Sequence, residues 1–190
     1  MRIDASEFLQ SHPGCWIAQR RGEFPVINLH AAEIAAAPAR VFDALADRSS
    51  LVPAWRWRAL FALRDLLGKL FNWDAGLKWY GPEALIPGNH YAFFRIEHVT
   101  APTDTSASLQ PPGSFELGLS VENKLTHALM SYVVAPQGSG SRLFNVTCAR
   151  FKGRTGRAYW RVIRPFHDAL AEDMLAHFCR RAERRGNSVL

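Results

Sequence analysis

Residues 91 to 151 constrain the fold of this chain most, because they carry the pattern of successive β-strands. The segment SFELGLSVEN (114–123) alternates between apolar residues on one side and polar or small residues on the other. Further candidate strands span 91–100, 125–135 and 141–151, and the last two are separated by PQGSG, a composition typical of a hairpin loop. Alternation of this kind indicates antiparallel strands with one apolar face over a core. The sequence therefore predicts one antiparallel sheet.

Helices are predicted before most of the sheet. Residues 28–36 can form a first strand. Pro38 then favours the start of a short helix, because the N–H that proline lacks is left unpaired in a first helical turn anyway. Residues 53–73 carry leucines at spacings of three and four, and aromatic residues widen this stripe. Such a wide apolar surface indicates a helix buried on more than one side, although its aromatic and basic residues would also fit a helix on a membrane surface.

The last predicted element is a long helix with a proline inside its pattern. The helix is expected from about Gly156 to Arg181, which at 1.5 Å per residue corresponds to roughly 39 Å. Pro165 removes the N–H that would bond to the carbonyl of Arg161, so the helix must either kink or begin afresh there. A kink would let the helix follow a twisted sheet, whereas a fresh start would leave 156–164 as a separate turn.

The order of these elements resembles the helix-grip fold of the START/Bet v 1-like superfamily. More specifically, residues 142–175 resemble the C-terminal signature of the DUF2867 family, in which a strand and a short linker lead through G-x-x-Y into a helix containing P-F-H. The matching residues are Gly156, Tyr159, Pro165, Phe166 and His167. Residues 38–72 resemble the early helices of that family, so the resemblance covers about residues 28–181. It implies an α+β fold in which a curved antiparallel β-sheet wraps around a long C-terminal helix, with two helices after the first strand.

We expect a single domain, because 190 residues are typical of one. The expected parts are an N-terminal extension over 1–27, a helix-grip domain over 28–185 and a tail over 186–190. The start of the chain lacks the basic and apolar regions of a signal peptide, and no stretch of about 20 apolar residues is present to span a bilayer. Three widely spaced cysteines argue against a disulfide framework. These observations favour a cytoplasmic protein and leave a homodimer open.

Most motifs that carry chemistry are absent from the sequence. The seven histidines form no HxH or HExxH pattern, and neither GxSxG nor the dinucleotide-binding GxGxxG occurs. We therefore expect no metal and no cofactor. The net charge of +6 comes mainly from arginine, and residues 150–161 interleave basic and aromatic side chains, as segments that bind nucleic acid do. A solvated surface and a polar linker are the simpler interpretation, so no nucleic-acid partner is expected.

The leading hypothesis is a domain that binds a small hydrophobic or amphipathic ligand in a cavity between the sheet and the C-terminal helix. The residues expected to line this cavity, form its entrance or orient the ligand are Trp79, Tyr80, Phe94, Leu117, Leu119, Met130, Phe144, Tyr159, Arg164 and His167. An alternative hypothesis is a cyclase, dehydratase or hydrolase that uses His167 as acid or base, since histidine titrates near neutral pH. A third is a membrane-surface or protein-interaction module built on the helix at 53–73.

Overall fold

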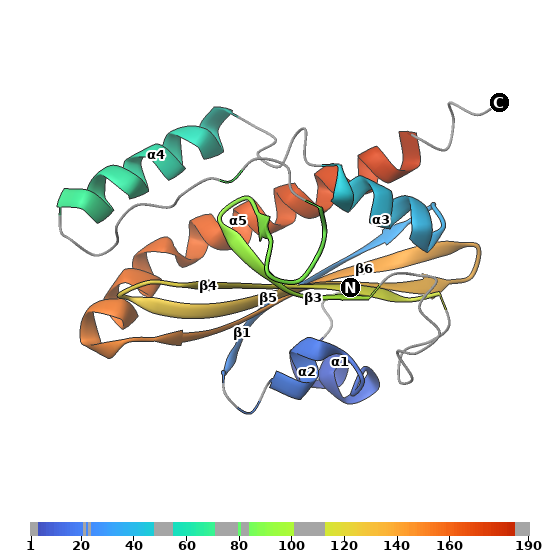
Figure 1. Ribbon diagram of the computed structural model, residues 1–190, viewed down its shortest axis with the longest axis horizontal. Helices are drawn as coiled ribbons and strands as arrows, with labels where there is room; N and C mark the ends of the chain where they lie inside the picture. Colours follow the sequence, from blue (N-terminus) through green and yellow to red (C-terminus); the bar gives the residue numbers. More distant parts are fainter. Residues whose placement is uncertain are drawn as a thin grey trace.

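The computed structural model describes residues 4–20, 22, 24–47, 55–70, 80, 84–100 and 113–184. In chain order its elements are α1 (Ala5–Ser11), α2 (Trp16–Arg20), β1 (Val26–Ile34), α3 (Pro38–Ala46), α4 (Trp55–Leu70), β2 (His90–Tyr91), β3 (Phe94–Thr100), β4 (Phe115–Glu122), β5 (Thr126–Gln137), β6 (Gly140–Phe151) and α5 (Gly153–Arg184). The predicted α+β architecture is confirmed, with one antiparallel sheet, two helices after the first strand and one long helix at the end (Figure 1).

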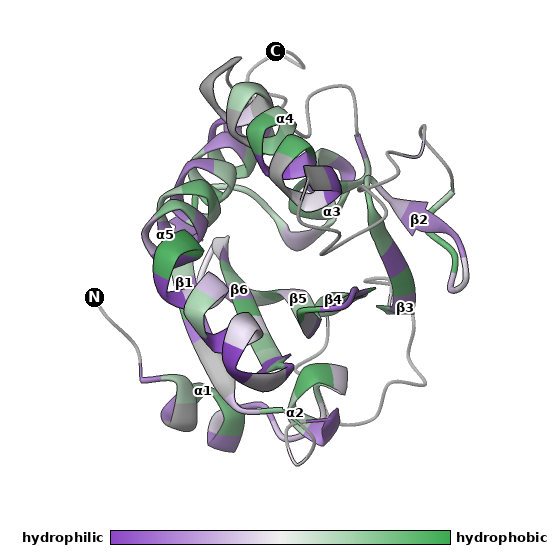
Figure 2. Cartoon of the chain, turned by 90° about the vertical axis from the view of Figure 1, so that its left-hand side faces the viewer, coloured by the Kyte–Doolittle hydropathy of each residue, from purple (hydrophilic) through white to green (hydrophobic). Residues whose placement is uncertain are grey.

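The strands run in the order β1-β6-β5-β4-β3-β2, and every neighbouring pair is antiparallel. β1 pairs with β6, so the first strand of the chain lies beside its last strand. The β5–β6 hairpin is tighter than the segment PQGSG suggests, because Gln137 pairs directly with Gly140 and the two residues between them make the turn. Gly138 has a φ of 57° in that turn, which glycine adopts without steric cost. Figure 2 shows how strongly the sheet curves.

Helices cover both faces of the curved sheet. α3, α4 and α5 lie over the concave face, and α1 and α2 lie against the opposite, convex face (Figures 1 and 2). α5 runs without interruption from Gly153 to Arg184, and Pro165 lies inside it. The alternative in which Pro165 begins the helix is therefore excluded. Among the described helices, none combines the length and the apolar character needed to cross a bilayer.

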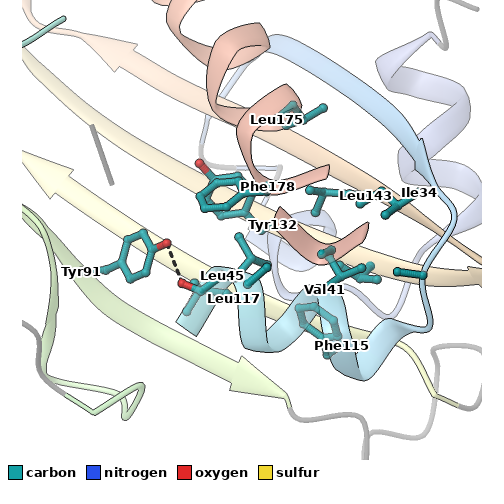
Figure 3. Packing of buried hydrophobic residues seen from close by; sticks show 14 of the residues in the cluster. Ile34, Val41, Leu45, Tyr91, Phe115, Leu117, Tyr132, Leu143, Leu175 and Phe178 are labelled. Carbon is teal, nitrogen blue, oxygen red and sulfur yellow. Dashed lines mark hydrogen bonds between the residues drawn. The ribbon is translucent and has the colours of Figure 1, made fainter. Parts of the chain in front are cut away.

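The core on the concave face is built by α3, the C-terminal half of α5 and the strands beneath them. Figure 3 shows its buried side chains, which include Ile34, Val41, Leu45, Tyr91, Phe115, Leu117, Tyr132, Leu143, Leu175 and Phe178. The hydroxyl of Tyr91 donates a hydrogen bond of 2.9 Å to the carbonyl of Leu45, which links β2 to α3. Arg181 of α5 forms an ion pair with Asp47, just after α3. These contacts fix α3 and the end of α5 on the sheet.

A second core lies on the convex face, where α1 and α2 pack against the sheet. Phe8 of α1 packs on Phe144 of β6 with ring centroids 4.6 Å apart, and Ile17 of α2 is fully buried. Both helices belong to one buried apolar cluster with residues of β5 and β6. Residues expected to form an N-terminal extension thus cover an apolar face of the sheet.

Glu116 of β4 is a buried carboxyl group beneath α2. It accepts hydrogen bonds from the backbone N–H groups of Trp16, at 2.7 Å, and Ile17, at 3.2 Å, and from the hydroxyl of Ser131. Burial raises the pKa of Glu116 above its ordinary value, while these three donors act in the opposite direction. Because Glu116 satisfies the first N–H groups of α2, it holds this short helix on the sheet.

Candidate functional site

A cleft of about 400 Å³ lies between the concave face of the sheet and the helices α4 and α5. In Figure 2 these two helices lie above the strands. β4, β5 and β6 form its floor, the first half of α5 one wall and α4 another, and residues 91–94 close one end. The lining is mainly apolar, with aromatic side chains such as Phe61, Phe93 and Trp160 from different elements. The cleft is thus a largely apolar hollow beside the concave core.

Small side chains on the floor leave room for this cleft. Ala128 of β5 pairs with Ala149 of β6, and both line the cleft. Farther toward α3, the same face carries Tyr132 and Leu143, which fill the space under α5. Alternate residues of a strand share a face, so the change from small to large side chains along β5 and β6 explains why the cleft lies at one end of the sheet and the core at the other.

Hydrogen bonds join α4 to α5 above the cleft. The indole N–H of Trp57 donates to Oδ2 of Asp173 at 2.7 Å, and Nε of Arg64 donates to the hydroxyl of Tyr159 at 3.2 Å. Arg64 also forms an ion pair of 3.2 Å with Asp65. Trp57, Arg64 and Tyr159 all line the cleft, so the side chains that hold the two helices together also shape its roof.

Some apolar side chains of α4 and α5 that line the cleft are exposed to solvent. Leu63, Val162 and Phe166 line it, yet their exposed fractions are 51%, 69% and 51%. Leu66, one turn along α4, is also exposed. Exposed apolar side chains that cluster on a protein surface often mark a ligand groove or a contact surface. These residues therefore form an apolar mouth.

Asn145 and Thr147 are buried polar residues on the floor of the cleft. Asn145 and Thr147 of β6 are 2% and 3% exposed and line the cleft. Within the described part of the chain, Oδ1 of Asn145 and Oγ1 of Thr147 have no hydrogen-bond partner, although buried polar atoms in folded proteins nearly always have one. On the neighbouring strand, burial raises the pKa of Tyr132, and a hydrogen bond with the Asn145 side chain acts in the opposite direction. The floor thus has hydrogen-bonding capacity that the fold does not use.

His167 of α5 places a titratable group in the cleft. Its Nδ1 lies 3.4 Å from Oδ1 of Asp168, and Asn28 of β1 donates to the same oxygen at 2.6 Å. Burial lowers the pKa of His167 below its ordinary value, while Asp168 acts in the opposite direction. At neutral pH the imidazole is therefore uncharged, with one donor and one acceptor nitrogen. In the residues that the structure describes, no group of three or more His, Cys, Asp or Glu side chains is placed to hold a metal ion.

Some of the residues expected to bind a ligand come together in the cleft. Those that line it are Phe94, Met130, Tyr159 and His167. Leu117 and Leu119 lie on the same concave face, but they are buried in the packed core beside the cleft. The binding roles of all six stay predictions.

The other expected residues lie elsewhere. Phe144 points to the convex face. The sequence does not predict this, because β6 is apolar on both sides and its local pattern does not distinguish one face from the other. Tyr80 stacks on His90 with ring centroids 3.6 Å apart and is not part of the lining. The side chain of Arg164 is 62% exposed and does not line the cleft either. Trp79 lies outside the described residues.

The sequence reasoning does not single out Asn145 and Thr147, although a signal for them exists. In RLFNVTCARF these two residues alternate with Phe144, Val146 and Cys148, so they share one face of the strand. Alternating polar residues on a strand normally indicate a side that faces solvent. Here the cleft and α5 cover that side, and a local pattern carries no information on what covers it.

Comparison with known proteins gives one family and several similar folds. The family DUF2867, described as a protein of unknown function, matches residues 22–174. No curated protein matches the chain.

Three solved structures illustrate the similar folds. The Mll3558 protein from Rhizobium loti is 14% identical over 80% of this chain and 98% of its own, with a TM-score of 0.42. The di-domain ARO/CYC StfQ from the steffimycin biosynthetic pathway is 17% identical over 90% of this chain, which spans 55% of StfQ, with a TM-score of 0.44. The lipid transfer and protein localization domain of human StarD13 is 18% identical over 80% of this chain and 75% of its own, with a TM-score of 0.37.

Proposed function

This chain belongs to the DUF2867 family, and from the geometry of its cleft we propose that it binds one small, mainly apolar molecule between the sheet and α5. The observation that carries the proposal is the cleft of about 400 Å³ with apolar walls beside a closely packed core. Small-molecule sites in proteins are concave and mostly apolar, have volumes of roughly 300 to 1,000 Å³, and contain a few polar groups that orient the ligand. The cleft matches this description in volume and in lining.

The distribution of side chains supports a ligand that enters from solvent between α4 and α5. An incoming apolar molecule can contact the exposed side chains of Leu63, Val162 and Phe166 in the apolar mouth. Burial of its apolar surface inside the cleft would contribute roughly 25 cal/mol per Å². The polar groups of the lining, such as His167 and Asn145, lie among apolar side chains and can fix the orientation of the bound molecule.

Titration with butylpyrene, an uncharged and apolar fluorophore, tests this proposal. We expect saturable binding with one molecule per chain, read from the pyrene fluorescence. At a concentration of about one hundred times Kd, the ligand should stabilise the fold by about 2.7 kcal/mol. For a chain of this size, that corresponds to a rise in Tm of about 5 to 10 °C.

A variant that fills the cleft separates binding inside it from adsorption on the surface. Ala128→Trp places a large ring on the floor and should weaken butylpyrene binding at least about tenfold, and Met130→Trp serves the same purpose if Ala128→Trp does not fold. The matched control is Ala158→Trp, which adds the same ring at an exposed position of α5 outside the cleft. Absence of saturable binding, or full affinity in a folded cleft-filling variant, would show that the proposal is wrong.

A further inference from the structure

The floor of the cleft carries polar atoms that the fold itself does not use. Oδ1 of Asn145 and Oγ1 of Thr147 are buried without a partner in the described residues and lie on the side of β6 that lines the cleft. The two residues are separated by one position, which places them about 7 Å apart along the strand. His30 of β1 pairs with Asn145 in the sheet register, and its buried Nε2 also has no partner among the described residues. Asn145 and Thr147 thus present a polar patch to the cleft under apolar walls, and His30 lies beside Asn145 outside the lining.

The chemistry of this patch selects the group that completes it. The side-chain oxygen of Asn145 is only an acceptor, whereas the hydroxyl of Thr147 can donate or accept. A ligand group must therefore donate a hydrogen bond to Asn145 and can accept one from Thr147. A hydroxyl does both, and an ether, ester or ketone oxygen does not.

The charges around the cleft disfavour an ionised ligand. Among the described lining residues, the basic side chains are Arg64 and His167. Arg64 is engaged with Tyr159 and Asp65, and burial lowers the pKa of His167, which keeps it uncharged at neutral pH. A carboxylate buried on this floor would find no unengaged cation among the described lining residues, and an unpaired buried charge is strongly unfavourable. These charges therefore favour a neutral ligand.

Aromatic walls favour a ligand that contains rings. The ring of Trp160 in α5 stacks on that of Phe151 in β6, with ring centroids 5.0 Å apart. The ring centroids of Phe93 and Phe94 are 4.2 Å apart. Both aromatic pairs line the cleft. Aromatic rings gain additional stability in offset or edge-to-face contacts with other rings. We propose that the natural ligand is a neutral, ring-bearing alcohol or phenol whose hydroxyl binds Asn145 and Thr147, a step that rests on the proposed function.

Three probes with the same apolar body test the inference: pyrenebutanol, pyrenebutyrate and butylpyrene. Each is titrated near neutral pH into the full chain, into Asn145→Leu and into Thr147→Val. We expect pyrenebutanol to bind at least about ten times more tightly than pyrenebutyrate. Asn145→Leu keeps the branched shape of the side chain and removes its acceptor, so it should lower the affinity for pyrenebutanol about fivefold or more and leave or raise the affinity for butylpyrene. Thr147→Val should change the affinities in the same direction.

Thermal melting of the ligand-free variants distinguishes a binding role from a structural one. Thr147→Val replaces the unpaired buried hydroxyl of Thr147 by a methyl group of the same shape, so it should melt at or above the wild-type temperature. Ser120→Ala is the matched control, because it removes a strand hydroxyl outside the cleft, one that donates to Glu97, and it should leave all three affinities unchanged.

The outcomes separate this inference from the function on which it rests. If none of the three probes binds saturably, the proposed function is wrong. If butylpyrene binds but pyrenebutyrate binds as tightly as pyrenebutanol, or if Asn145→Leu affects the alcohol and butylpyrene equally, the apolar site stands and the hydroxyl inference is overturned. A large loss of thermal stability in Thr147→Val would likewise overturn it, because the Thr147 hydroxyl would then serve the fold.

Discussion

Gly156 lies where the first turns of α5 approach the turn between β4 and β5. A Cβ added at this position would collide with the backbone carbonyl oxygen of Leu125. That oxygen already accepts a hydrogen bond of 2.8 Å from the N–H of Lys152, so it cannot move away without breaking the contact. The glycine of the G-x-x-Y pattern thus allows the helix to begin directly against the sheet.

We expect Gly156→Ala to destabilise the protein by about 1 to 3 kcal/mol, the usual range for overpacking a filled space. Helix propensity alone predicts the opposite sign, because alanine favours a helix interior by about 1 kcal/mol over glycine. Urea unfolding measures the difference. The control Arg157→Ala changes the next, exposed residue and should stay within about 0.5 kcal/mol of the wild type. A Gly156→Ala protein as stable as the wild type would contradict the close approach.

Individual residues show how far the sequence predicts the site. Tyr159 and His167 are expected at the cleft from their place in the last helix, and both line it. Phe144 lies on the face opposite to the predicted one, because β6 is apolar on both sides and its sequence shows no alternation that would identify the concave face. Asn145 and Thr147 carry the polar chemistry of the floor, but their burial depends on α5, which lies far from them along the chain.

At the scale of elements, hydrophobic periodicity predicts the amphipathic helices and strands and misses the short ones. The apolar face of β4 lies in the concave core as expected, with Leu117 and Leu119, but Glu116 and Gly118 on its other face are buried as well. α5 starts three residues earlier and ends three residues later than expected, and its pattern continues through Pro165. By contrast, α2 has five residues and β2 has two. Elements this short depend on tertiary contacts, such as the hydrogen bonds of Glu116 to α2, and leave almost no periodic signal.

Pro165 is an exposed residue in the middle of α5, so its replacement tests why the helix contains it. Pro165→Ala provides an N–H for the carbonyl of Arg161 and removes the steric conflict of the ring. After allowance for the greater freedom of the unfolded chain, we expect a gain of about 2 kcal/mol. The corresponding rise in Tm is about 4 to 8 °C.

The same substitution should weaken ligand binding. Phe166 and His167 directly follow Pro165 and line the cleft, so a new hydrogen bond to the carbonyl of Arg161 would shift this turn of the helix and change how both side chains project. We expect the Kd for butylpyrene to rise about threefold or more. Thr155→Ala, an exposed change toward a better helix former in the first turn of α5, should leave Kd unchanged. A Pro165→Ala protein that is less stable than the wild type would show that the proline serves the fold rather than the cleft.

On the scale of the whole molecule, one sheet separates two apolar clusters that differ in how they are covered. The concave side combines a packed core with the cleft, and the convex side is closed by α1 and α2. The alternation of β4 predicts a single apolar face, but β5 and β6 carry buried residues on both faces. This explains why the first 27 residues are expected to form an extension, although their helices cover the second face of the sheet.

Phe8→Ala tests whether the convex core supports the fold without taking part in binding. Phe8 is 1% exposed and packs on Phe144, so its truncation should cost about 3 to 5 kcal/mol, as for other buried phenylalanines. Because the cleft lies on the other face, Kd for butylpyrene, measured well below the lowered Tm, should stay within about twofold of the wild type.

Leu66→Ala removes an exposed apolar side chain of α4 and should change stability by less than about 0.5 kcal/mol. If Phe8→Ala leaves the free energy of unfolding unchanged, the N-terminal helices are dispensable for the fold; if it changes Kd more than stability, the two faces are not independent.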